Sequence, residues 1–131
     1  MTILIVQNHR EQKQLGTNSR ILAWHDQVYI YSKQATKILS GVQQHQPDLV
    51  VLDLELFQIK KMELISLLRL DWLTRTIPIM IITNLKSYPK LATANLDFDA
   101  CLVKPYSLQE LERVICSLLP IPGCELSVSV F

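Results

Sequence analysis

The sequence predicts a three-layer α/β fold, in which helices cover both faces of a doubly wound, five-stranded parallel sheet. Four short runs rich in β-branched residues alternate with helical patterns, at residues 3–6, 28–31, 49–52 and 79–82, and a weaker fifth run follows at 100–103. Each run is apolar throughout, which indicates burial on both faces and is typical of parallel strands. Strand–helix units joined by right-handed crossovers place helices on both sides of such a sheet.

Three of the connecting segments have clear helical patterns. After Ser32, a candidate N-cap, apolar residues recur at helical spacing until Pro47 prevents continuation. A second helix is expected over residues 61–70, from the spacing of its apolar residues. The last helix has the strongest signal, because Ser107 and Glu110 form an S-x-x-E capping box ahead of an apolar stripe that ends at a proline.

The remaining segments are less regular. Residues 9–24 contain Gly16, so a helix there starts late or breaks at the glycine, and residues 86–96 leave room only for a short helix. Residues 124–131 alternate between apolar and polar, which fits an extra edge strand, a strand that binds a partner, or disorder. We therefore expect one domain over residues 1–119 and a tail over residues 120–131.

Composition excludes several classes of function. The chain has 131 residues, 49% of them hydrophobic, and a formal net charge of +1 without a basic run, so we expect neither nucleic acid nor a membrane as partner. No apolar stretch approaches the roughly 18 residues of a membrane span and no leader pattern is present, which predicts a cytoplasmic protein. Three cysteines without CxxC spacing indicate neither a zinc site nor a disulfide framework.

Chemically useful side chains follow the predicted strands at their carboxyl ends, where open α/β sheets bind ligands. Gln7 and Asn8 follow the first run, Asp53 the third, Thr83 the fourth and Lys104 the fifth. A carboxylate can be a nucleophile or metal ligand, a hydroxyl can bind an anionic oxygen, and an ammonium group can neutralise a phosphoryl charge. The alternative for the aspartate is a strand-end acid that caps a turn, and the threonine alone would be unremarkable.

The stretches "PDLVVLDLEL", "IPIMIIT" and "ACLVKPY" together resemble the receiver domain of two-component response regulators, over residues 2 to about 119. This resemblance implies a (βα)5, flavodoxin-like fold and a phosphoryl group passed from the histidine of a sensor kinase to Asp53. It also implies that Thr83 is the switch hydroxyl, that Lys104 contacts the phosphoryl group, and that the peptide bond between Lys104 and Pro105 is a candidate cis bond.

The chain departs from the family pattern at the metal site and at the switch. Gln7 and Asn8 stand where phosphorylated members usually have an acidic pair that holds Mg²⁺ with the aspartate, and Cys101 stands at the aromatic switch position. Amides bring no charge, and Mg²⁺ sheds water reluctantly without carboxylates. We therefore expect a weak Mg²⁺ site at best, formed by Asp53 and Glu55, and no required cofactor.

Three functions are compatible with these observations. The first is a stand-alone, atypical receiver that binds signalling proteins, such as a histidine kinase or an output protein, or a second copy of itself. Its partner face would lie on the last strand and the helices beside it, with Leu91, Leu96, Phe98 and Tyr106 as candidates. The second is a single-domain response regulator that is competent for phosphorylation, whose only catalysis would be its own phosphorylation and dephosphorylation.

The third function, a flavodoxin-like cofactor binder or a small hydrolase, belongs to another class. The segment "QNHREQK" after the first strand is too bulky and too poor in glycine for a flavin phosphate loop, and the chain has no G-x-S-x-G nucleophile elbow. We therefore expect a signalling protein and not an enzyme.

Overall fold

The computed structural model describes residues 1–8, 25–53, 58–86, 89 and 96–119, and for residues 58–61 the backbone alone. Its five strands form one sheet in the order β2-β1-β3-β4-β5, and every neighbouring pair is parallel. The strands are β1 (Thr2–Gln7), β2 (Asp26–Tyr31), β3 (Leu49–Asp53), β4 (Ile79–Asn84) and β5 (Ala100–Lys104). The predicted doubly wound parallel sheet is confirmed.

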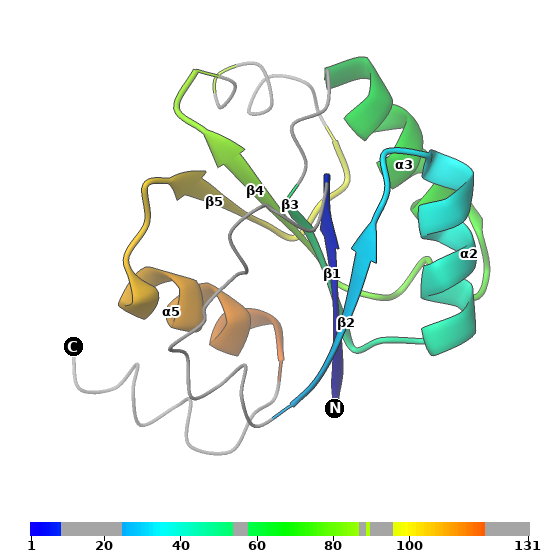
Figure 1. Ribbon diagram of the computed structural model, residues 1–131, viewed down its shortest axis with the longest axis horizontal. Helices are drawn as coiled ribbons and strands as arrows, with labels where there is room; N and C mark the ends of the chain where they lie inside the picture. The colour runs from blue at the N-terminus through cyan, green and yellow to red at the C-terminus, as the bar shows by residue number, and fades with distance from the viewer. Residues whose placement is uncertain (9–24, 54–57, 87–88, 90–95, 120–131) are drawn as a thin grey trace.

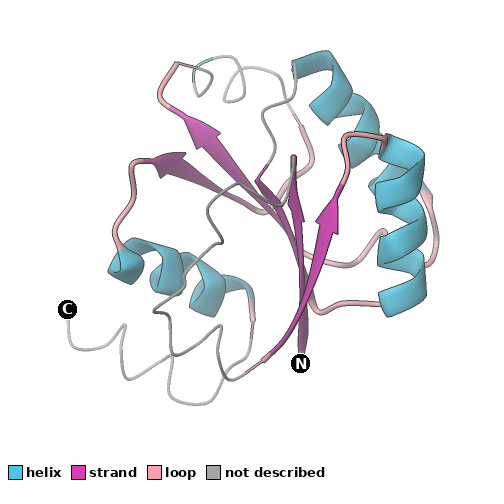
Figure 2. Ribbon diagram, in the orientation of Figure 1, coloured by secondary structure: helices cyan, strands magenta, loops and turns pink. Residues whose placement is uncertain are grey.

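The described helices lie on both sides of the sheet, as Figure 1 and Figure 2 show. They are α2 (Ala35–His45), α3 (Gln58–Leu70) and α5 (Leu108–Leu118). Helices α2 and α3 pack on one face, and α5 covers the other. The three expected layers are therefore present.

Two apolar clusters fill the spaces between the layers. The cluster under α5 includes Ile3, Val51 and Leu102 from the sheet and Ile115 from the helix. The cluster under α2 and α3 is formed by the alternate residues of the same strands, together with helical side chains such as Val42 and Leu68. Because both faces of β1, β3 and β4 are buried, these strands are apolar over residues 3–6, 49–52 and 79–82, as the sequence predicted, and polar residues stand only at their ends.

The pleat of the strands determines which side chains meet at the carboxyl edge. Alternate residues of a strand point to the same face, so Gln7 continues the row of Ile3 and Ile5 under α5. By the same alternation Asp53 continues the row of Leu49 and Val51, and Lys104 follows Ala100 and Leu102. All three polar residues thus belong to the α5 side of the sheet.

The helix ends agree with the sequence at α5 and differ at α2. At α5, the Ser107 side chain accepts a hydrogen bond from the Glu110 backbone and the Glu110 side chain accepts one from the Ser107 backbone, so the predicted capping box is confirmed. At α2, the N-cap is Gln34 and not Ser32. The Ser32 hydroxyl instead accepts a hydrogen bond from the Gln34 N–H, a local turn that competes with capping.

Several predictions lie outside the described residues. They concern the helix within residues 9–24, most of the short helix within 86–96, including Leu91, the tail 120–131 and the carboxylate of Glu55. Among the helices of the described part, none is long and apolar enough to cross a membrane. Cys116 is disulfide-bonded, which the sequence did not indicate, since it predicted no disulfide framework.

Candidate functional site

The carboxyl edge of the sheet holds a buried carboxylate with two donors from neighbouring strands. Asp53 is 3% exposed at the end of β3. The Lys104 ammonium nitrogen lies 2.8 Å from Oδ1 of this aspartate, and the Gln7 amide donates a hydrogen bond to Oδ2 at 3.3 Å. Gln7 is the residue directly opposite Asp53 in the pairing of β1 with β3. The side chains of Asp53, Lys104 and Gln7 therefore meet at this edge of the sheet.

The electrostatics of this group are balanced. A carboxylate is costly to bury unless it is paired and hydrogen-bonded, and here an ammonium group and an amide satisfy both of its oxygens. Gln7 is itself fully buried, so a charged group at the position of its amide would interact strongly with the Asp53 carboxylate. The Lys104 side chain is 38% exposed and remains within reach of a charged group arriving from solvent.

Thr83 lies at the same edge, near the end of β4 between β3 and β5. It is 4% exposed, and its hydroxyl oxygen has no hydrogen-bond partner in the described part of the chain. Buried hydroxyls are nearly always paired, because an unpaired one loses its bonds to water without replacement. A hydroxyl in this position could bind an oxygen atom of an incoming ligand.

Tyr106, a sequence candidate for the partner surface, is influenced by the charge of this site. Its ring packs half-buried against the core under α5. Burial raises the pKa of Tyr106 to about 12, with further contributions from the negative charge of Asp53 and from Tyr29. The phenol therefore lies within electrostatic reach of the Asp53 carboxylate. The only sequence signal was its position two residues after Lys104, directly after the proline that ends β5.

The candidate residues for a partner surface that the structure describes pack against different apolar clusters. Leu96 and Phe98 pack against the cluster under α2 and α3, whereas Tyr106 packs against the cluster under α5. Residues that are close to β5 in the sequence therefore pack on opposite faces of the sheet. Cys101 is a partly buried cysteine on β5, and the peptide bond between Lys104 and Pro105 is cis.

The described residues at this edge do not suit Mg²⁺. Across the described ranges, no group of three or more His, Cys, Asp or Glu side chains could hold a metal ion. Asp53 is one carboxylate, and its charge is already compensated by Lys104. Gln7 adds a neutral amide, whereas Mg²⁺ is normally held through carboxylates together with retained water.

Comparison with known proteins identifies the family. The family model described as the response regulator receiver domain matches residues 3–116. The chain belongs to this family. This receiver is therefore a module of two-component signal transduction and not a conventional enzyme. A comparison with curated proteins finds no match.

Solved structures share the receiver's fold at low sequence identity. A response regulator from Chloroflexus aurantiacus J-10-fl has a TM-score of 0.71 and 24% identity, covering 92% of this chain and 98% of that chain. The chemotaxis protein CheY4 of Vibrio cholerae has a TM-score of 0.71 and 18% identity, with coverage of 90% and 98%.

A third structure with the same fold contains a bound metal ion. It is the receiver domain of the sensor histidine kinase PA1611 from Pseudomonas aeruginosa, with a TM-score of 0.73, 14% identity and coverage of 92% and 98%. That receiver holds a magnesium ion in its active-site cleft. Receiver domains can therefore coordinate Mg²⁺ in their active site.

Proposed function

We propose that this chain is an atypical receiver of the cytoplasm that transmits signals through protein–protein contacts, with weak or absent Mg²⁺-dependent phosphorylation at Asp53. The observation that supports this proposal is the hydrogen bond from the Gln7 amide to Oδ2 of Asp53. A neutral donor occupies the register position opposite the aspartate. Its partners would be a histidine kinase, an output protein, or both.

The charge balance explains why metal binding should be weak. An excess of carboxylates attracts a divalent cation, because the ion relieves their mutual repulsion. In this site one carboxylate faces one ammonium group at 2.8 Å, so no excess negative charge remains between them. A Mg²⁺ ion would have to lose hydration water and compete with Lys104 for the same aspartate. The site is then stable without metal and holds Asp53 in one arrangement.

A second function has specific support. Thr83 offers a buried hydroxyl without a partner in the described residues, and Lys104 is partly exposed to solvent. Both could bind the oxygens of a phosphoryl group on Asp53, as in a receiver that is competent for phosphorylation. The amides and Glu55 would then have to provide enough affinity for Mg²⁺.

The two functions differ in whether the site captures a phosphoryl group in the presence of metal. We would record ¹⁵N NMR spectra during titration with Mg²⁺ into the millimolar range and then with beryllofluoride, which mimics an aspartyl phosphate. The atypical receiver should show no coordinated movement of the Asp53, Thr83 and Lys104 signals.

The matched control is Asp53→Asn, which removes the acceptor and keeps the shape of the side chain. If beryllofluoride moves the signals of the site in the wild type and not in this variant, the receiver is competent for phosphorylation and our proposal is wrong. Signals that move equally in both proteins would report nonspecific binding of fluoride or metal. That result would support the proposal, because no specific capture of a phosphoryl group takes place.

A further inference from the structure

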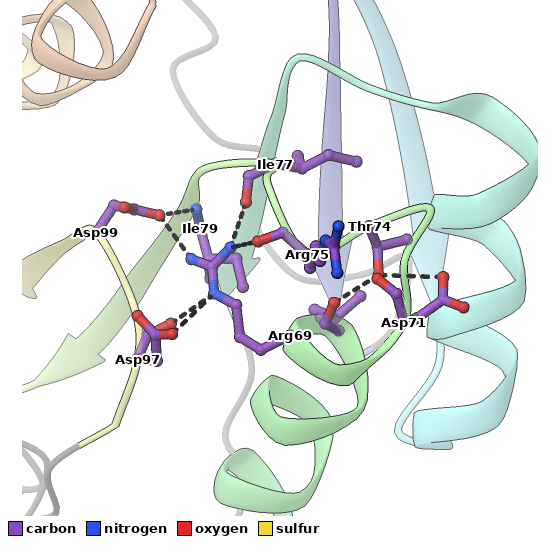
Figure 3. A network of polar contacts seen from close by, with 9 residues as sticks. Arg69, Asp71, Thr74, Arg75, Ile77, Ile79, Asp97 and Asp99 are labelled. Atoms are coloured by element: carbon purple, nitrogen blue, oxygen red, sulfur yellow. Dashed lines mark hydrogen bonds and ion pairs between the residues drawn. The ribbon is translucent and has the colours of Figure 1, made fainter.

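A second polar network lies at the opposite, amino edge of the sheet, where α3 ends (Figure 3). The Arg69 guanidinium donates hydrogen bonds to the backbone oxygens of Asp97 at 2.9 Å, Arg75 at 2.9 Å and Ile77 at 2.8 Å. It also forms an ion pair with Asp99 at 2.7 Å. One side chain thus joins the end of α3, the turn that follows it and the segment before β5. The sequence analysis did not single out this residue.

The turn after α3 is further held by Thr74. This residue is 1% exposed, and its hydroxyl donates a hydrogen bond of 2.6 Å to the Leu68 carbonyl. The backbone N–H groups of Thr74 and Arg75 both donate to the Asp71 carbonyl. Side-chain and backbone hydrogen bonds within the chain therefore hold the backbone of residues 71–75 in place without a binding partner.

Large apolar side chains nevertheless project from this fixed turn into solvent. Leu70 is 83% exposed, Trp72 is 75% exposed and Leu73 is 37% exposed. We call these three residues the Trp72 patch. They are three of the seven exposed large hydrophobic residues in the described part of the chain, and they lie within four consecutive positions. Exposed apolar groups that cluster in this way mark binding surfaces, and tryptophan is enriched among the residues that dominate binding energy.

The charges around the patch indicate what covers it. Within the same turn, the partly buried Asp71 provides negative charge and the exposed Arg75 provides positive charge, and the 83%-exposed Asp97 lies 3.7 Å from Arg69 at the end of α3. A surface with both signs at its border is complementary to itself when two copies meet about a twofold axis, because each arginine can face an acid of the other copy. The formal net charge of +1 adds little repulsion between copies. An anionic membrane, in contrast, would be repelled by the two acids.

We infer that the Trp72 patch is the contact surface of a weak, reversible homodimer of this chain. The exposed apolar surface amounts to about 400 Å² on each copy, given that a large aromatic side chain buries about 150–250 Å². Stable interfaces bury about 800 Å² on each partner, so we expect this smaller contact to give a weak dimer that forms only at high protein concentration. Because the turn is already ordered, little conformational freedom is lost on association.

This inference does not depend on the function proposed for Asp53. The patch follows α3 at the amino edge, whereas Asp53, Thr83 and Lys104 lie at the carboxyl ends of their strands. Dimerisation through this patch would leave the Asp53 site open in both copies. It would also leave the face around β5 available for another protein.

The test is sedimentation velocity over a concentration series from about 20 μM to about 1 mM, a range set by the expected weak affinity. We expect the wild-type sedimentation coefficient to rise with concentration and that of Trp72→Asp to remain that of a monomer. The matched control is Leu85→Asp, since Leu85 is 72% exposed but follows β4 at the carboxyl edge. This control should dimerise like the wild type, and circular dichroism melts should show that all three proteins are folded.

A second variant, Arg75→Glu, tests the charge argument and should weaken dimerisation at least threefold at low salt. A wild type that stays monomeric up to the highest concentration overturns the inference, as does a Trp72→Asp variant that dimerises normally. Cosedimentation of a monomeric wild type with phosphatidylcholine vesicles would overturn it in favour of a membrane surface.

Discussion

The ammonium nitrogen of Lys104 and Oδ1 of Asp53 lie 2.8 Å apart across the carboxyl edge of the sheet, with β4 between their strands. The carboxylate is 5% exposed and the lysine side chain is 38% exposed. The ion pair therefore links the buried Asp53 carboxylate to the partly solvent-exposed Lys104 ammonium group. Both the stability of this edge and its response to metal should depend on that contact.

Replacement of Lys104 by methionine should destabilise the protein by about 2 kcal/mol. Loss of one partner of a fully buried pair costs about 3–5 kcal/mol, and the partial exposure of Lys104 reduces this figure through solvent screening. Urea unfolding at pH 7 measures the change. Lys37→Met, on the exposed side of α2, is the control and should change stability by less than about 0.5 kcal/mol.

The unpaired carboxylate should account for most of this loss. Asp53→Asn in the Lys104→Met background removes the buried charge and should recover much of the stability. A Lys104→Met protein as stable as the wild type would show that the ion pair contributes nothing.

Replacement of Gln7 by glutamate should create a response to Mg²⁺. The new carboxylate would occupy the buried position opposite Asp53, so two negative charges would face one lysine. We expect the variant to be less stable than the wild type without metal, because like charges repel at short distance. Addition of 10 mM Mg²⁺, about the upper range for a weak carboxylate site, should then raise its melting temperature. An equal shift in the wild type would contradict our explanation of weak metal binding.

Replacement of Arg69 by methionine should cost about 3 kcal/mol in the free energy of unfolding. The guanidinium has three backbone acceptors and the Asp99 carboxylate, and a hydrogen bond that involves a charged group contributes about 1.5–3 kcal/mol net, less where solvent screens it. Arg69→Lys should recover less than half, because an ammonium group cannot reproduce the planar fork.

The control for Arg69 is Arg75→Met, since the hydrogen bonds of Arg75 in the network of Figure 3 involve its backbone N–H and carbonyl. This exposed side chain should change stability by less than about 0.5 kcal/mol. Similar losses of stability in Arg69→Met and Arg75→Met would mean that removal of a positive charge, and not loss of this network, destabilises the protein.

Tyr106 should make the folded protein sensitive to high pH. Its pKa is raised to about 12 in the folded chain, mainly by burial, whereas an unfolded tyrosine titrates near its ordinary value of 10.0. A raised pKa means that the stabilising contribution is fully present below pH 10 and is lost as the pH rises through 12. Absorbance at 295 nm and denaturant unfolding between pH 9 and pH 12, the interval around these two values, measure both effects.

Two substitutions assign this titration. Tyr106→Phe should remove the component of highest pKa, and Asp53→Asn should lower the pKa of Tyr106 by removing the second of its causes. A high-pH titration that both variants leave unchanged would place the phenol away from the aspartate.

Much of the fold was predictable because its signals are local. The run of residues 49–52 is apolar on every position, and a parallel strand buried on both faces requires that pattern. Ser107 and Glu110 act within one helical turn, so their capping box could be recognised directly. At Ser32 the same reasoning was wrong, since a serine hydroxyl can serve a turn as well as a cap and the sequence does not choose between them.

The sequence by itself determined that a carboxylate, a hydroxyl and a lysine end neighbouring strands of a parallel sheet, because strand pattern and order follow from local periodicity. Only the tertiary structure decided that Gln7 bonds to Asp53, that Tyr106 lies beside this site and that Arg69 ties α3 to the start of β5. It also decided that Trp72 is exposed. These relationships depend on strand register and on side chains that cross between elements, and such distances arise only when distant parts of the chain pack together.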